Sequence, residues 1–544
     1  MKNIKETSNF IKTIIKKDLE NKKYKKIITR FPPEPNGFLH LGHARAIVIN
    51  FELSSFFKGK TYLRYDDTNP EKEKLIYVDA ILKDIKWLGY QPDKITFASD
   101  YFEKMYQKAL LLIKKNKAYV DDLNSEQIKK YRGNLNEKGI NSPYRNRNIQ
   151  ENLDLFQKMK KGFFKKGEKV LRAKIDMSSS NINLRDPVLY RILDNYTLKK
   201  IHWFIFPSYD YAHPLEDSIE KISHSLCSLE FEDHKPLYNW ILKETEIKNP
   251  PTQIEFGRLN IINTCLSKRN LNFLVKNSLV QGWDDPRMPT LSGLKRRGFT
   301  PESIKNFILE AGIAKNNTDI KIEMMEYFLR KDLENKSKKA IAVINPLKVT
   351  ITNYPKNKIE FFKIPFHPNK SFGERKIFFS RYIYIEKEDF CIQKPDKKYK
   401  RFFLNGEVRL LNAYFIKAYK VIKDENNNII EILATYDEKT KSGTGFKERK
   451  PNGTIHYVEQ TTAKKAIFNF FGPLFQEQNN SNNKNNNFNF NSLIKKNSFV
   501  ENSLEKVIDL EKIQFMRHGY FSADQKEKKI LNFNEIVSLK KSYK

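Results

Sequence analysis

The chain has 544 residues, 39% of them hydrophobic and 13% aromatic, which is enough apolar surface to build several globular cores. Its formal net charge of +34 indicates a polyanionic partner such as nucleic acid, although a coding bias toward lysine would raise the charge as well. No apolar run approaches the roughly 18 residues of a membrane span, no secretory signal is recognisable and the three cysteines form no CxxC pair, so we expect a cytoplasmic protein with no membrane segment, zinc motif or disulfide framework.

The N-terminal part of the sequence predicts a short amphipathic helix and then a βαβ unit. Apolar residues between Phe10 and Ile15 predict the helix. A β-prone run at Ile27 and Ile28, a long and mostly apolar segment over residues 44–57, and the run TYLRYDD then indicate strand, helix and strand. This order predicts an α/β fold, in which ligands bind at the carboxyl ends of the strands.

The connection between the first strand and the helix reads PPEPNGFLHLGHAR, residues 32–45. Its prolines stiffen the chain and its glycines permit close backbone approach. His43 falls in the first helical turn, where unpaired N–H groups and the positive end of the helix dipole attract phosphate. Arg30 and the pair Asp66–Asp67 map to the same edge, so the sequence predicts a site for a phosphate-bearing ligand. The alternative is that His40 and His43 are ordinary surface residues at a helix start.

Further elements follow along the chain. Apolar residues at helical spacing predict an amphipathic helix over residues 73–88, with Leu75 on its buried face. Residues 100–200 indicate a separate unit of helices and basic turns, and a second α/β segment follows it. Residues 300–335 are expected to be helical, with Thr300 as the N-cap.

Beyond residue 340 the pattern changes to short β-prone runs, such as VTITNY, KIEFFKI and KIFFSRYIYI, which alternate with Asn, Gly, Pro and Lys turns. This alternation predicts an all-β region of sandwich or barrel type. The low-complexity segment 478–491 is expected to be a loose loop.

Two motifs carry a resemblance to a known family. HLGH at His40–His43 resembles the HIGH signature of the class I aminoacyl-tRNA synthetases, and CLSKR at Cys265–Arg269 resembles their KMSKS loop. The departures are Leu41 for the usual Ile, Leu266 for the usual Met and Arg269 for the final Ser, and the first two keep apolar bulk. The chain is similar to the glutaminyl-tRNA synthetase family nearly end to end, through RFPPEPNGFLHLGH, RYDDTNP, LRAKIDM, RDPVLYRI, HSLCSLEFED, GWDDPRMPTLSGLKRRG and QFMRHGYF.

The resemblance implies an α/β fold class with several domains. These are a class I Rossmann-like catalytic domain with an inserted acceptor-stem domain, a helical connecting subdomain and a C-terminal β-barrel anticodon-binding region. The implied boundaries are 1–26 for an N-terminal helical segment, 27–100 and 201–270 for the two halves of the catalytic domain, 101–200 for the inserted domain, 271–338 for the connecting subdomain and 339–544 for the β-barrels.

The resemblance also implies a reaction, the attachment of L-glutamine to tRNA(Gln) through a glutaminyl-adenylate, with release of AMP and diphosphate. ATP is the nucleotide, Mg²⁺ is expected beside it with no assigned protein ligand, and the protein is expected to be a monomer. Phosphoryl charge builds up when the glutamine carboxylate attacks, which is why His40, His43 and Lys268 are the implied catalytic residues. A surface lysine is the alternative for Lys268. The implied ATP-binding residues are Glu34, Pro35, Asn36, His40, Leu41, Gly42, His43, Ala44, Arg45, Ala46, Ser228, Arg258, Leu259, Leu266, Ser267 and Lys268.

The implied glutamine pocket consists of Asp66, Arg30, Tyr209 and Gln253. Asp66 is suited to the α-ammonium of the substrate, because a buried charge needs a partner. The other three match positions around the side-chain amide. The alternatives are an ordinary strand-end carboxylate for Asp66 and a core tyrosine for Tyr209.

The resemblance implies two sets of tRNA contacts. Leu135 is expected as a wedge at the first base pair of the acceptor stem, and Asp233 is expected against the minor groove of that stem; a core leucine and a surface acid are the alternatives. Unstacked single-stranded bases are what proteins read in RNA. The residues that match anticodon-reading positions are Lys339, Lys398, Arg401, Gln514 and Arg517.

Three other functions compete with this interpretation. A glutamyl-tRNA synthetase shares both signatures, but glutamate-specific relatives place an arginine where this chain has Cys227, and the bacterial ones have a helical anticodon domain. A cytidylyltransferase-like enzyme also uses HxGH, but it would not need a long β-barrel region. A noncatalytic RNA-binding relative is disfavoured by the intact HLGH and LSKR motifs.

Overall fold

The computed structural model describes residues 9–262, 264, 267–475, 488–525 and 530–539. The chain divides into two units, one formed by Met1–Ile262 with Lys305–Ile320 and the other by Asn263–Ile304 with Lys321–Lys544. Helix α11 (Pro301–Ala311) contains a boundary between them. Within the described ranges, no helix is both long enough and apolar enough to cross a bilayer.

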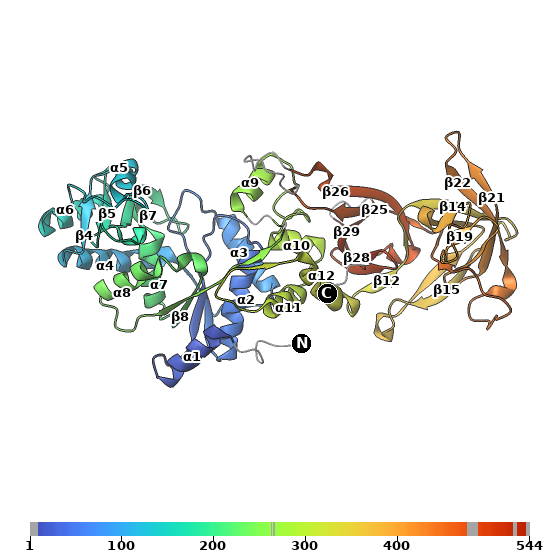
Figure 1. The fold of residues 1–544 in the computed structure, drawn as a ribbon, viewed down its shortest axis with the longest axis horizontal. Helices are drawn as coiled ribbons and strands as arrows, with labels where there is room; N and C mark the ends of the chain where they lie inside the picture. The colour runs from blue at the N-terminus through green and yellow to red at the C-terminus, as the bar shows by residue number, and fades with distance from the viewer. Residues whose placement is uncertain (1–8, 263, 265–266, 476–487, 526–529, 540–544) are drawn as a thin grey trace. The chain divides into compact units, whose positions relative to one another are not determined.

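The first unit contains the predicted βαβ element (Figure 1). Strands β1 (Ile28–Phe31), β2 (Lys60–Tyr65) and β3 (Lys94–Phe97) form a parallel sheet in that order. Helix α2 (Leu41–Phe56) connects the first two strands and starts three residues earlier than the apolar run suggested. The reason is local, because the side chain of His40 caps the helix by accepting a hydrogen bond from Gly42 N.

A second parallel pair lies beside this sheet. Strand β8 (His224–Ser228) pairs with β9 (Thr252–Phe256), and Ser223 N, just before β8, donates to Ile28 O over 2.9 Å. The predicted N-terminal helix is α1 (Phe10–Glu20), and it packs with α2 over these strands. The shared core consists of Ile11, Ile15, Ile27, Ile49, Leu53, Leu226, Ile254 and Phe256.

Helix α3 (Leu75–Trp87) is two residues shorter at its start than predicted. Ile81 and Ile85 are buried as expected, but Leu75 is 55% exposed, so its assignment to the buried face was wrong. Glu73 lies before the start of the helix and is buried, and its Oε1 accepts a hydrogen bond from Asn69 N.

An antiparallel sheet is formed by residues from the middle of the first unit's sequence. Its order is β4 (Ala118–Asp121), β5 (Val170–Ala173), β6 (Val188–Tyr196) and β7 (His202–Pro207), so its last strand lies beyond residue 200. Figure 1 shows α4 and α6 beside these strands. The helices of this region are α4 (Phe102–Lys114), α5 (Ser125–Arg132), α6 (Ile149–Lys160), α7 (Tyr209–Ile219) and α8 (Lys235–Glu244). One core joins the sheet to α7 and α8, through Phe156, Leu171, Tyr190, Tyr211 and Leu237.

The predicted helical region 300–335 is interrupted. Thr300 Oγ1 accepts a hydrogen bond from Ser303 N, which confirms the predicted cap of α11. Strand β11 (Thr318–Ile320) then pairs in parallel with β10 (Leu259–Ile261) before α12 (Ile322–Glu334) begins, so the prediction of helix throughout was wrong. The other helices of the second unit are α9 (Lys268–Lys276) and α10 (Leu291–Arg297).

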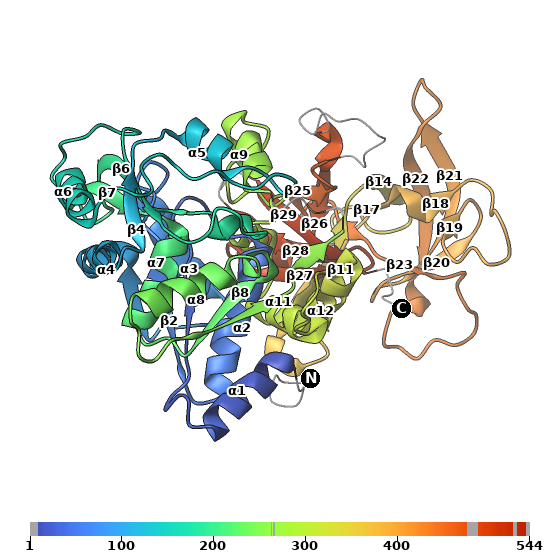
Figure 2. The ribbon, with the colours of Figure 1, turned by 60° about the vertical axis from the view of Figure 1, so that its left-hand side comes forward.

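Two seven-stranded sheets confirm the predicted β-rich region, and both are barrel-like (Figure 2). In the first, the two outermost strands, β12 (Lys338–Ala340) and β13 (Ala342–Val343), are separated in sequence by one residue, Ile341. Between them lie β27 (Lys512–Phe515), β28 (Gly519–Ala523), β29 (Leu531–Ser538), β25 (Lys464–Phe471) and β26 (Leu493–Val500). Phenylalanines fill this core, among them Phe468, Phe515, Phe521 and Phe533.

The second sheet is built in the same way. Its outermost strands β23 (Thr454–Ile455) and β24 (Val458–Glu459) are neighbours in sequence. Between them lie β20 (Glu407–Leu410), β21 (Phe415–Lys423), β22 (Ile429–Asp437), β14 (Pro346–Ile351) and β17 (Tyr382–Glu386). Two short pairs accompany it, β15 (Glu360–Pro365) with β16 (Glu374–Phe379), and β18 (Phe390–Cys391) with β19 (Phe402–Phe403). Of the loose loop predicted over residues 478–491, residues 478–487 lie outside the described residues.

Candidate functional site

The two histidines of HLGH interlock at the start of α2. His40 Nδ1 accepts from Gly42 N, and His43 Nδ1 accepts from His40 N, each over 3.1 Å. Their ring centroids are 3.9 Å apart. Because each ring accepts at Nδ1, its proton lies on Nε2, which makes Nε2 a hydrogen-bond donor. Together with the N-terminal end of α2, these donors suit a phosphoryl oxygen.

The proline-rich turn is fixed against the end of β2 by backbone hydrogen bonds. Asp66 N donates to Pro33 O over 3.1 Å, and Lys74 N donates to Pro35 O over 3.0 Å. The structure therefore brings the turn that contains Glu34, Pro35 and Asn36 next to Asp66, as the shared sheet edge predicted.

Two carboxylates at this edge are buried and incompletely paired. Among the described residues, Asp66 Oδ1 and Glu73 Oε2 have no hydrogen-bond partner. Burial raises the pKa of Asp66, and it raises the pKa of Glu73 to about 9. A buried carboxylate oxygen without a partner is costly, so this pocket is suited to a cationic group such as an ammonium.

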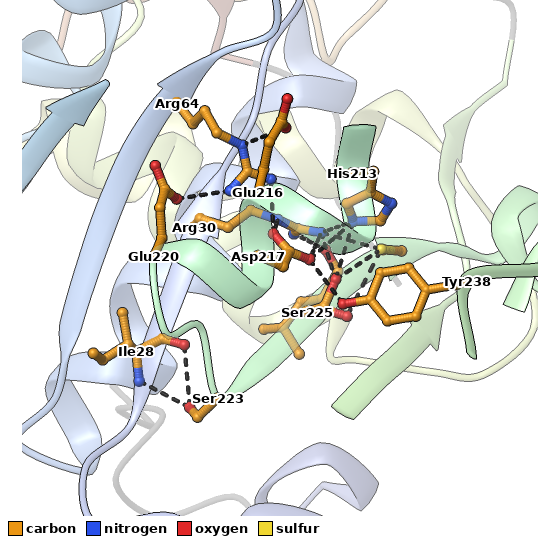
Figure 3. A network of polar contacts seen from close by, with 12 residues as sticks. Ile28, Arg30, Arg64, His213, Glu216, Asp217, Glu220, Ser223, Ser225 and Tyr238 are labelled. Atoms are coloured by element: carbon orange, nitrogen blue, oxygen red, sulfur yellow. Dashed lines mark hydrogen bonds and ion pairs between the residues drawn. The ribbon is translucent and has the colours of Figure 1, made fainter. Parts of the chain in front are cut away.

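Arg30 is fully buried and donates to several acceptors (Figure 3). Its Nε lies 3.1 Å from Asp217 Oδ1, its Nη1 donates to Leu226 O over 2.8 Å and its Nη2 donates to Ser225 Oγ over 2.6 Å. His213 Nε2 lies 2.6 Å from the same Nη2. The guanidinium is therefore held in one orientation and its charge is balanced by Asp217.

A second buried arginine shares this acid. Arg64 Nη2 lies 2.7 Å from Asp217 Oδ1, and Arg64 also pairs with Glu216 and Glu220. These three acids lie on one face of α7, at or next to its C-terminal end. The sequence did not single out Arg64 or these acids, because acids at helical spacing also occur on solvated helix faces.

The two remaining candidates of the glutamine pocket, Tyr209 and Gln253, lie near partners of Arg30, and Cys227 lies beside Arg30 itself. Cys227 Sγ is 3.4 Å from Arg30 Nη2. Burial alone would raise the pKa of the Cys227 thiol, but Arg30 and His213 outweigh it and lower the pKa to about 7. The Tyr209 ring stacks on that of His213 with the centroids 5.2 Å apart. Gln253 is opposite Ser225 in the β8–β9 register, and its Nε2 donates to Glu255 Oε1 over 2.9 Å.

Several candidate ATP-binding residues are also brought together within the first unit. Arg258 forms an ion pair with Glu230, in the short 3₁₀ helix η3 (Leu229–Phe231) that follows Ser228. Leu259 starts β10 and is buried. Leu41, Gly42, Ala44, Arg45 and Ala46 all lie in the first turns of α2.

Arg45 is 2% exposed, and no described residue accepts a hydrogen bond from its guanidinium. Burial lowers the pKa of Arg45 to about 10. A buried cation needs a partner, so Arg45 is suited to bind an anionic group of a ligand.

The second signature motif lies in the other unit. Lys268 is the first residue of α9, and Ser267 is its N-cap. Cys265 and Leu266 lie outside the described residues.

The candidate acceptor-stem contacts lie on anchored loops. Leu135 is 82% exposed. Its loop is held by Arg185, whose Nη1 donates to the carbonyl oxygens of Arg132, Asn134 and Glu137 over 2.8–3.0 Å. The Asp233 carbonyl accepts from Asn181 Nδ2 over 2.7 Å, and the residue is exposed. An exposed apolar tip on a fixed loop suits a wedge, and it contradicts the alternative of a core leucine.

The candidate anticodon contacts form two groups in the second unit. Arg401 and Arg517 line a cavity of about 450 Å³. Lys339 and Gln514 are register partners on the neighbouring strands β12 and β27. Lys398 lies apart, exposed on the loop before β19.

One group of side chains among the described residues has the spacing of a metal site, namely Glu386, His456 and His518. His518 Nε2 lies 3.0 Å and His456 Nε2 lies 3.7 Å from Glu386 Oε1. Arg517 Nη1 lies 3.4 Å from His456 Nδ1, and an arginine can only donate. The His456 proton is therefore on Nε2, which leaves no lone pair there for a metal, so we interpret this group as a polar cluster around Glu386 and not as a metal site.

Known proteins are similar to this chain over both of its units. The model of the catalytic domain of the class I tRNA synthetases (E and Q) matches residues 26–335, and two models of their anticodon-binding domains match residues 337–437 and 454–524. A protein of Clostridium perfringens named glutamine--tRNA ligase is 53% identical over 100% of both chains. A protein of the same name from Clostridioides difficile is 52% identical over 100% of both chains. One from Buchnera aphidicola is 48% identical over 98% of this chain and 96% of its own.

Proposed function

Because the chain belongs to the class I tRNA synthetases for glutamate and glutamine, we propose that it attaches L-glutamine to tRNA(Gln) with ATP. Glutamine is first activated as glutaminyl-adenylate and is then transferred to the tRNA, with release of diphosphate and AMP. The proposal includes a cytoplasmic monomer and the domain boundaries given above, with the inserted domain extended to Pro207 so that it contains strand β7. Its support is the full-length similarity to proteins named glutamine--tRNA ligase, together with the geometry around Arg30.

Activation requires donors where negative charge develops on the α-phosphate. The glutamine carboxylate attacks the phosphorus, and the bond to the leaving diphosphate breaks. His40 and His43 offer Nε2–H donors at the start of α2, where the helix dipole favours the same charge. Lys268, at the start of α9, supplies a cation, and bound Mg²⁺ would supply further positive charge to the phosphates. We assign Mg²⁺ no protein ligand, because magnesium commonly keeps several waters and binds the phosphates of the substrate.

The proposed amino-acid pocket contains one carboxylate that is incompletely paired, Asp66, and one guanidinium whose charge is already balanced, Arg30. Asp66, buried with one oxygen unpaired, binds the α-ammonium of the substrate. Arg30 lies where the side-chain end of the substrate is expected, but its charge is balanced by Asp217 and its donors are shared among Asp217, Leu226 and Ser225. It can donate to an amide oxygen, but it provides no uncompensated charge for a carboxylate. This engagement is the observation that favours glutamine over glutamate.

The deciding experiment measures aminoacylation of tRNA(Gln) with labelled glutamine and labelled glutamate side by side. ATP–diphosphate exchange with each amino acid, with and without tRNA, accompanies it. Charging with glutamine alone supports the proposal. Comparable charging with glutamate would establish the glutamyl-tRNA synthetase alternative instead.

A further inference from the structure

Asp389 is the shared acceptor of the two arginines that line the cavity of the second unit. It ends the short 3₁₀ helix η5 (Lys387–Asp389), and its side chain is fully buried. Arg517 pairs with it through two parallel contacts, Nη2 to Oδ1 and Nη1 to Oδ2, each 2.6 Å. Arg401 Nη1 lies 3.3 Å from the same Oδ1 and also donates to Glu388 O over 3.0 Å.

The backbone at Arg517 shows how closely this geometry is specified. Arg517 lies in the turn between β27 and β28 with a φ of +70°, which side chains other than glycine rarely adopt. Such a conformation persists only where the surroundings hold it, and strained residues concentrate at functional sites. The paired contact to Asp389, 128 residues away in the sequence, is the strongest contact that holds this side chain.

The cavity beside the two arginines fits an unstacked base. Its volume is about 450 Å³, and its walls include Phe470, Lys496, Asn345 and Glu388. Arg401 and Arg517 are 45% and 38% exposed, so each uses one edge on Asp389 and keeps other donors accessible. An aromatic ring for stacking and guanidinium donors for hydrogen bonding are the features by which proteins hold single-stranded bases.

We propose that Asp389 is a positioning residue for tRNA recognition, which fixes Arg401 and Arg517 as one unit facing the cavity. Two guanidinium cations this close repel each other, and the shared carboxylate removes that repulsion and sets both planes. Asp389 itself is buried behind the arginines, so it acts through them. This inference rests on the proposed function, because it assumes that the cavity receives a base of the bound tRNA.

The test compares Asp389→Asn and Asp389→Ala with the control Glu425→Gln, which removes one charge from an exposed turn of the same unit. We expect the Asp389 variants to raise the Kd and the KM for tRNA(Gln) about tenfold, the scale of one lost arginine contact. The kcat and the KM for glutamine and ATP should stay near wild type, and discrimination against anticodon-substituted tRNA should fall. A merely structural residue would instead lower the melting temperature without this split between KM and kcat.

Double-variant cycles keep the test decisive if an Asp389 variant folds poorly. With Asp389 intact, the tRNA-affinity losses of Arg401→Ala and Arg517→Ala should be strongly non-additive, because the two side chains act as one unit. Additive losses, or wild-type tRNA affinity and discrimination in folded Asp389 variants, would overturn the inference. A wild-type protein that binds tRNA(Gln) but charges it with another amino acid would overturn the proposed function only, since tRNA affinity tests Asp389 independently.

Discussion

Arg30 donates from Nε to Asp217 Oδ1 over 3.1 Å, although the two residues are 187 positions apart in the sequence. The same oxygen lies 2.7 Å from Arg64 Nη2, so one buried acid serves two buried arginines. Burial alone would raise the pKa of Asp217, but the cations around it, Arg30 first, hold that pKa well below its usual range. The charge on Arg30 is thereby neutralised inside the pocket that is proposed to select the amino acid.

Asp217→Asn tests this neutralisation. The substitution keeps the shape of the side chain but leaves two buried guanidinium groups with less negative charge, and breaking a buried ion pair costs about 3–5 kcal/mol. We expect the free energy of unfolding of the first unit to fall by about 3–5 kcal/mol, and the ratio of glutamine to glutamate charging to fall as well. Chemical denaturation and competitive aminoacylation measure the two effects.

The matched control is Asp79→Asn, on the exposed side of α3. It removes the same charge from the same unit and should change neither stability nor selectivity. If Asp217→Asn folds and keeps wild-type selectivity, the balance of the Arg30 charge does not set the choice of amino acid.

Cys227→Arg tests the same pocket from the other side. Cys227 Sγ lies 3.4 Å from Arg30 Nη2, so a second guanidinium here would add a cation that no described acid balances. A γ-carboxylate would gain a partner and the neutral amide would not. We expect glutamine charging to fall, glutamate charging to rise and the gap between them to narrow. Cys227→Ser, which adds no charge, is the control, and an equal loss in both variants would contradict the role of charge.

The parts of this structure that depend on neighbours in sequence could be predicted from the sequence. The proline-rich turn, the start of α2 near His43 and the Thr300 cap are local, because turn chemistry and capping act within a few residues. The alternation of short β-prone runs likewise indicated the β-rich half of the chain. Even so, the predicted start of α2 at residue 44 was three residues late, because the side chain of His40 caps the helix and lets it begin at Leu41.

The parts that depend on distant contacts could not be predicted. Leu75 fits the apolar face of α3 by spacing but is exposed, because burial depends on what packs there. Strand β11 interrupts the helical region only because β10, 59 residues earlier, is available for pairing. Asp217 and Asp389 looked like ordinary acids for the same reason, since Arg30 lies 187 residues from the first and Arg517 lies 128 residues from the second.

His43→Ala and Lys268→Ala test the proposed chemistry of activation. Each removes one donor or cation at the developing phosphoryl charge, and losses of this kind cost about 2.7–4 kcal/mol in the transition state. We expect glutamine-dependent ATP–diphosphate exchange in the presence of tRNA to fall about 100- to 1000-fold, with circular dichroism unchanged. Lys276→Ala, at the exposed end of the same helix as Lys268, should be close to wild type. Near-native exchange in both folded variants would show that these residues do not carry activation.

Glu73 predicts a pH dependence of stability. Burial raises its pKa to about 9, and the nearby Asp67 and Asp66 carboxylates act in the same direction. The unfolded chain releases this proton above about pH 4.3, whereas the folded protein keeps it, so the free energy of unfolding falls as pH rises from about 4.3 toward 9, by up to about 1.4 kcal/mol per pH unit. Glu73→Gln removes this dependence. Its stability advantage over wild type should therefore be larger at pH 8 than at pH 5 in urea titrations, while the exposed control Glu126→Gln should show no such trend. Parallel curves for Glu73→Gln and wild type across this range would mean that Glu73 is not held protonated in the folded protein.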